Sequence, residues 1–231
     1  MPTSLAAPPA PHASPGLIIT TALIALSLVF VAWAVTGYAS TIAHEGGHAL
    51  TASAFGATVL ELVINRDTSG HTRVLGAGPG ASVAIGLAGY LGPSAFGLAG
   101  AALLSGDRAR AVLWLSLFFL ACALLVSRGW VSRVSVLALG GAFVLVLRAH
   151  SPNLEAWFAY TWIWFLLISG VRDTLGLARI RSRGPDRATD AYHLRQLTYV
   201  PASVFTGLFV VLSLAAAIFG AVVLLGGHRG A

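Results

Sequence analysis

The feature that most constrains this chain is a long run without a single charged side chain, GLIITTALIALSLVFVAWAVTG, at residues 16–37. A helix needs about 20 consecutive apolar residues to cross the hydrocarbon of a bilayer, so this run is long enough to span a membrane. Of the 231 residues, 57% are hydrophobic and only 10% are charged, whereas a soluble domain has roughly 25% charged residues. The chain is therefore predicted to be an integral membrane protein.

Hydropathy along the chain predicts an all-α polytopic membrane protein with six or seven transmembrane helices. The apolar segments cover residues 16–37, 39–55, 79–104, 110–127, 131–147, 156–171 and 200–225. After the second segment, β-branched residues flank the turn-rich stretch NRDTSG, which predicts a short β-hairpin over residues 58–74. Residues 1–15 are rich in proline and alanine and are expected to be a disordered tail. Residues 16–226 are expected to form one transmembrane domain.

The basic residues of the chain are all arginine, fourteen in number, and they lie between the apolar runs. The net charge of +6 therefore indicates membrane topology and not nucleic-acid binding. If the helices alternate, ten arginines share the side of the hairpin, the 128–133 turn and the 172–199 loop. The positive-inside rule makes that side cytoplasmic, which places the N-terminus in the cytoplasm and, with seven spans, the C-terminus outside. A re-entrant second segment would invert everything after it.

The third apolar segment has small residues at three-residue spacing, Gly86, Gly89, Gly92 and Ala95, with Pro93 interrupting the expected helix. Small residues allow close approach between membrane helices, so tight packing is one interpretation. A substrate groove beside a broken helix is the other.

The strongest chemical signal is IAHEGGHALT, residues 42–51, which places two histidines and one of the three glutamates in an apolar stretch. Residues four apart lie on one face of a helix, so His44 and His48 can bind one metal ion through their ring nitrogens. Glu45 is near enough to hold the metal-bound water, to take its proton as general base and to return it as general acid. Ionisable side chains inside a membrane are costly and mark function. The alternative is a pair of interfacial histidines beside a helix-flanking glutamate.

HEGGH in an apolar helix, in a polytopic chain with a hairpin after it and an acidic residue far downstream, resembles the site-2 protease family of intramembrane zinc metallopeptidases. Within that family the chain is most similar to the compact bacterial branch. The resemblance implies that His44 and His48 bind Zn²⁺, that Glu45 activates water, and that an aspartate at the start of a later helix is the third ligand. It also implies a single-span membrane protein as substrate. The lysine-free, arginine- and alanine-rich composition fits a GC-rich bacterial genome, so the expected location is a bacterial cell membrane.

A catalytic zinc ion normally has three protein ligands and one open position for water, so a third ligand is required. The acidic residues downstream of both the motif and the hairpin are Asp107, Glu155, Asp173, Asp186 and Asp190. Asp190 is preferred because residues 188–197 begin a helix that leads into the last apolar segment, although a first-turn acid near the helix dipole is the alternative. Asp173, directly after a span, is the main rival. His193 could bind the metal or support its ligands.

Two questions stay open at this stage. With alternating helices the HEGGH motif begins near the outer side and Asp190 belongs to the cytoplasmic loop, so the two meet only if residues 190–200 dip inward or the second segment is re-entrant. The hairpin is either a connector or an edge strand that pairs with an extended substrate.

A zinc metalloendopeptidase is the preferred function, and a non-catalytic membrane scaffold or a metal-binding or transport protein is the alternative. The oligomeric state is not indicated.

Overall fold

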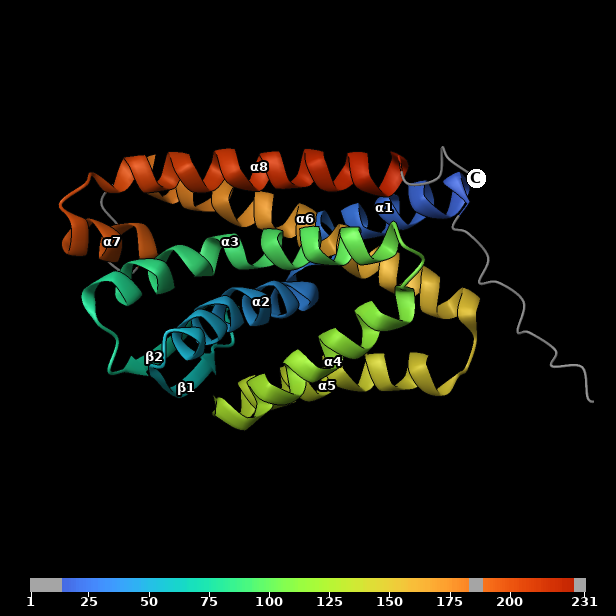
Figure 1. The fold of residues 1–231 in the computed structure, drawn as a ribbon, viewed down its shortest axis with the longest axis horizontal. Coiled ribbons are helices and arrows are strands. Elements are labelled where there is room, and N and C mark those ends of the chain that lie inside the picture. The colour runs from blue at the N-terminus through green and yellow to red at the C-terminus, as the bar shows by residue number, and fades with distance from the viewer. Residues whose placement is uncertain (1–13, 183–188, 227–231) are drawn as a thin grey trace, which may run out of the picture.

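The computed structural model describes residues 14–182 and 189–226, and over these residues it confirms an all-α polytopic membrane protein with a small β-sheet (Figure 1). The long helices α3, α6 and α8 lie along one another, and the sheet and the short helix α7 gather at one end of the bundle. Most of the predicted tail, residues 1–13, and residues 183–188 of the predicted arginine-rich loop lie outside the described residues.

Five helices are long and apolar enough to cross a membrane, and a sixth span results if the bent pair α1 and α2 is counted as one. This agrees with the lower of the two predicted numbers. Most of the bounds lie within a few residues of the predicted segments: α3 Pro79–Leu104, α4 Ala109–Val126, α5 Trp130–Arg148, α6 Pro152–Ser182 and α8 Ala202–Gly226. The main difference is α6, which continues as a helix through residues 172–182, where a loop was expected.

The first apolar run is not a single helix. The chain bends by 100° between α1 (Pro15–Phe30) and α2 (Trp33–Ala54), so the expectation of one span over residues 16–37 is wrong. With 16 residues, α1 is shorter than the about 20 that a span requires. The Thr36 hydroxyl donates a hydrogen bond of 2.7 Å to the Leu28 carbonyl and so satisfies one of the carbonyls that a helix end leaves unpaired. We call this bend at residues 31–32 the elbow.

Helices α2 and α3 pack at backbone distance. A methyl group added at Gly47 would lie 2.5 Å from the Ala88 carbonyl oxygen, and one at Gly92 would lie 2.8 Å from the Ala43 carbonyl oxygen. These contacts favour the tight-packing interpretation of the small residues, although Ala95 is exposed and takes no part. The expected interruption at residue 93 is wrong, because α3 continues through it.

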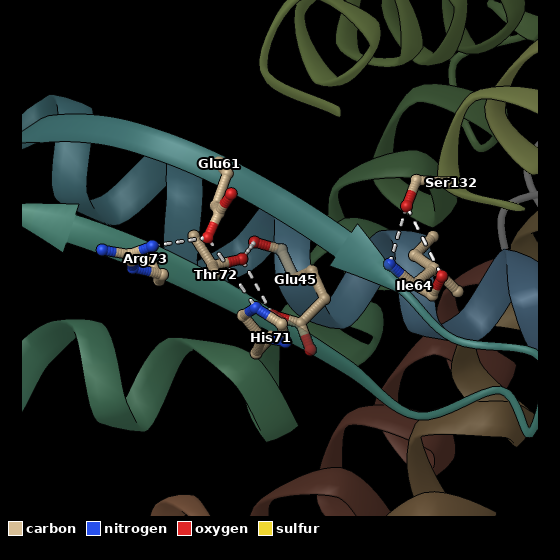
Figure 2. A network of polar contacts seen from close by, with 7 residues as sticks. All are labelled: Glu45, Glu61, Ile64, His71, Thr72, Arg73 and Ser132. Atoms are coloured by element: carbon tan, nitrogen blue, oxygen red, sulfur yellow. Dashed lines mark hydrogen bonds and ion pairs between the residues drawn. The ribbon is translucent and has the colours of Figure 1, made fainter. Parts of the chain in front are cut away.

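The predicted hairpin over residues 58–74 is present as the antiparallel strands β1 (Thr58–Ile64) and β2 (Gly70–Leu75). A third strand, β3 (Ser127–Arg128), pairs in parallel with β1, so the order is β2-β1-β3. The Ile64 amide at the end of β1 donates to the Ser132 hydroxyl of α5 over 2.8 Å, as Figure 2 shows. The sheet is therefore fixed on the α5 side, while the outer edge of β2 has no partner strand among the described residues.

The short helix α7 (Asp190–Thr198) is held by apolar contacts on its inner side. Ala191 and Leu194 are fully buried in a small hydrophobic cluster with Phe205 and Phe209 of α8. Burial of these side chains is favourable by about 25 cal/mol per Å² of apolar surface. The docking of α7 positions its first residue, Asp190, against α2.

Candidate metal centre

The two histidines of the HEGGH motif lie one turn apart in α2, with ring centroids 5.0 Å apart. His48 is buried, and its Nδ1 lies 2.7 Å from the Ile85 carbonyl oxygen of α3. A carbonyl oxygen can only accept a hydrogen bond, so Nδ1 carries a hydrogen, and in the neutral form of the ring Nε2 offers its lone pair to a metal ion. This is the arrangement by which proteins orient a histidine ligand.

The Asp190 carboxylate lies directly opposite both rings. Its Oδ2 is 3.2 Å from Nε2 of His44 and 3.3 Å from Nε2 of His48. One ligand atom from each of the three residues lies within 4.8 Å of the other two. The structure therefore brings the two histidines and the preferred aspartate together. The elbow explains how, because it places α2 at the same end of the bundle as α7.

The charge state of Asp190 suits a ligand role. Burial alone would raise the pKa of this carboxyl group, but the charge of His48 and hydrogen bonds from His44 and His48 outweigh burial and hold the pKa well below its usual range. The carboxylate is therefore ionised at neutral pH, which is the form that binds a cation.

The geometry of this group fits a zinc ion. A tetrahedral site with bonds of about 2.0–2.1 Å has ligand-to-ligand distances of about 3.3–3.4 Å, close to the separations of the Asp190 oxygen from the two nitrogens. A methyl group at Gly89 of α3 would lie 2.6 Å from the His44 Nε2 and in contact with the His48 Nε2. The missing side chain at Gly89 thus leaves room for an ion in front of the two nitrogens.

The Glu45 side chain is 4% exposed and projects from α2 toward the hairpin. Its Oε2 accepts a hydrogen bond of 2.8 Å from the Thr72 hydroxyl of β2, as Figure 2 shows. Glu45 lines the same cavity of about 680 Å³ as His44, His48 and Asp190. A carboxylate next to a candidate metal site, in a cavity that admits water, is placed for proton transfer.

The other candidates line this cavity without joining His44, His48 and Asp190, which we call the ligand group. Asp173 accepts a hydrogen bond of 2.6 Å from the Ser40 hydroxyl and is not among the described groups that could share one ion. His193 and His71 also line the cavity outside that group, and His71 lies 4.0 Å from the Glu61 carboxylate.

Several contributors carry no motif in the sequence. The Tyr90 ring lies edge-on to the His44 ring at 4.7 Å and stacks on Phe209 at 5.1 Å, which fixes the orientation of the His44 imidazole. Thr72 and the Ile85 carbonyl were likewise not predicted. Gly89 was singled out in the sequence as one of the small residues at three-residue spacing. That spacing gave no indication that Gly89 would lie next to a metal site.

The comparisons with known proteins give one match. A family model described as Peptidase M50B-like matches residues 17–220, a range that contains all three residues of the ligand group and Glu45. The same comparisons find no match among the curated proteins and none among the solved structures.

Proposed function

The chain belongs to the Peptidase M50B-like family, within the site-2 protease family, and from this membership and the geometry of the site we propose that it is an intramembrane zinc metalloendopeptidase. We assign the activity to a single domain over residues 16–226. The observation that carries the proposal is the convergence of His44, His48 and Asp190 on one point, with Glu45 on the wall of the same cavity.

We propose that His44, His48 and Asp190 hold Zn²⁺ and leave a fourth position open. Bound zinc supplies a Lewis acid that polarises the scissile carbonyl group and lowers the pKa of water. Ile85 keeps the His48 ring in the tautomer that presents Nε2, and Tyr90 holds the His44 ring by an edge contact.

Glu45 performs the proton transfers in this proposal. Its carboxylate takes a proton from the attacking water and then delivers that proton to the leaving amine nitrogen, so the residue acts first as base and then as acid. Its burial against β2 keeps the side chain out of bulk solvent. A scaffold or a structural metal site would need no base at this position.

The substrate has to reach the site in an extended form, because a helix hides its own carbonyl groups in hydrogen bonds. The outer edge of β2 borders the cavity, with Gly70, His71 and Thr72 among the lining residues. We propose that an extended segment of a single-span membrane protein pairs with this edge, as peptides do in strand addition. Cleavage would then release an anchored protein from its membrane segment.

We further propose an orientation in a bacterial cell membrane. The hairpin, the α4–α5 connection and the end of α6 lie at one end of the bundle (Figure 1), and the arginines concentrate there. The positive-inside rule makes this end cytoplasmic. With the bent pair as one span, the start of α1 lies at the opposite end, so the cytoplasmic N-terminus that was expected from two separate spans before the hairpin does not follow.

The test combines metal content with cleavage. Wild type, Glu45→Gln and the control Glu61→Gln, a hairpin carboxylate paired with Arg73, are purified in detergent and incubated with a panel of tagged single-span membrane proteins. We expect about one zinc ion per chain in all three proteins. We expect cleavage by wild type and by the control, abolition by a chelator, and a loss of about 10²–10⁴-fold in Glu45→Gln.

Two results would contradict the proposal. One is cleavage by Glu45→Gln at the wild-type rate, which would remove the base from the mechanism. The other is zinc-loaded wild type that cuts no member of the panel, which would favour a membrane scaffold or a metal-binding protein.

A further inference from the structure

We propose that Thr72 is a positioning residue, whose hydroxyl holds the Glu45 carboxylate from the hairpin. This inference rests on the proposed function for its catalytic meaning. It assigns the hairpin a second task beside substrate pairing, because the strand that would receive the substrate also orients the base.

The contact is direct. The Thr72 Oγ1 lies 2.8 Å from the Glu45 Oε2 and 3.1 Å from the Glu45 carbonyl oxygen. The hydroxyl has one hydrogen to donate, and the shorter contact to a charged acceptor is the stronger hydrogen bond. Among the described residues, Thr72 is the one hydrogen-bond donor that the structure gives to this carboxylate. Oε1 is left to exchange a proton with water.

The inward face of β2 is shaped around the same side chain. A methyl group at Gly70 would lie 2.8 Å from the Glu45 Oε1 and 2.9 Å from its Cγ. Residues two apart in a strand point to the same face, so Gly70 and Thr72 enclose the carboxylate together. Gly70 leaves space for the carboxylate because it has no side chain, and Thr72 supplies the hydroxyl group.

The hairpin is held against α2 by further hydrogen bonds on the same side of that helix. The Tyr38 hydroxyl donates to the Arg66 carbonyl over 2.7 Å, and the Thr41 hydroxyl donates to the Thr68 carbonyl over 2.6 Å. Residues 38, 41 and 45 follow the three- and four-residue spacing of one helix face. The position of Thr72 relative to Glu45 is therefore fixed by the packing of the hairpin on α2.

The experiment compares Thr72→Val, which removes the hydroxyl at nearly constant shape, with Thr72→Ser, which keeps it. Thr58→Val makes the same change at an exposed position of β1 and is the control. Zinc content, kcat and KM are measured on a single-span substrate that wild type cleaves. In Thr72→Val we expect unchanged zinc and a kcat lower by about 10–100-fold, the size of effect that misplacing a reacting group produces. We expect KM to change little, and Thr72→Ser to recover most of the loss.

Equal kcat values in Thr72→Val and Thr58→Val would overturn the inference. Equal losses of kcat in Thr72→Val and Thr72→Ser would also overturn it, because packing and not the hydroxyl would then matter.

A second measurement needs no activity. If the hydroxyl holds Glu45, adding Thr72→Val to wild type lowers the melting temperature. Adding Thr72→Val to the Glu45→Ala variant lowers it much less, because the contact is already lost. Equal losses of melting temperature in the two backgrounds would overturn the contact, even if no substrate were cleaved. A smaller loss in the Glu45→Ala background, without any cleavage, would support the contact and contradict the proposed function alone.

Discussion

At the scale of single residues, the distinction that matters most is between two aspartates of one cavity. Asp190 faces the Nε2 atoms of both histidines, whereas the Asp173 carboxylate is engaged by Ser40. The sequence left this choice open because both aspartates lie between the last two apolar segments, in the 172–199 region. The docking of α7 against α8 brings Asp190 to the two histidines, and that docking depends on contacts far apart in the chain.

The first prediction at this scale concerns zinc retention. Asp190→Ala removes a proposed direct ligand, so we expect a loss in zinc affinity larger than the about 10–100-fold typical when a residue that only supports a ligand is lost. Asp173→Ala is the matched control, and we expect it to keep its zinc. Elemental analysis of the two purified variants measures the difference, with circular dichroism as a check of folding. Zinc loss in the folded Asp173 variant alone would reverse the assignment.

At the scale of elements, α3 matters because it approaches the ligand group without contributing a ligand. Gly89→Ala would place a methyl group in the space in front of the two Nε2 atoms. We expect the variant to lose zinc and activity while its melting temperature stays close to that of wild type, because the about 1 kcal/mol by which alanine favours helix over glycine offsets the cost of displacing the two imidazole rings.

Gly80→Ala is the control for this variant, since it makes the same change in the same helix with open space around the new methyl group. Metal titration of both proteins by calorimetry provides the readout. Wild-type zinc affinity in Gly89→Ala would show that the ion lies elsewhere.

The elements themselves were predictable to different degrees. Apolar length located α3, α4, α5 and α8, and turn residues located the hairpin. The elbow was not predictable, because residues 31 and 32 are valine and alanine in an apolar run, with no glycine or proline to mark a break. The two-residue strand β3 was not predictable either, because its pairing with β1 joins segments more than sixty residues apart. Both depend on tertiary contacts that local periodicity does not contain.

At the scale of the whole molecule, the arrangement predicts which ends of the helices share a side of the membrane. Leu75 at the end of β2 and Gly106 in the α3–α4 connection are both exposed and lie at opposite ends of α3. In a Cys122→Ser background we expect Gly106→Cys to react with a membrane-impermeant maleimide on intact cells. We expect Leu75→Cys to react only after the cells are opened, since it lies on the arginine-rich side.

Labelling of both cysteines on intact cells would show that α3 does not cross the bilayer. Labelling of Leu75→Cys alone would invert the proposed orientation. The Gly106→Ser variant in the same cysteine-free background serves as the unlabelled control.

The elbow also bears on the fate of the products. Because it places the HEGGH helix at the hairpin end of the bundle, the proposed protease would cut a membrane anchor nearer one surface than the middle of the hydrocarbon. Such a cut divides the anchor unequally. One product keeps most of its apolar residues and stays in the bilayer, while the other carries an apolar stub far shorter than the about 20 residues that span a membrane. The second product could then leave the bilayer without being extracted, so the bend in a single helix pair would decide which product of the proposed cleavage is released.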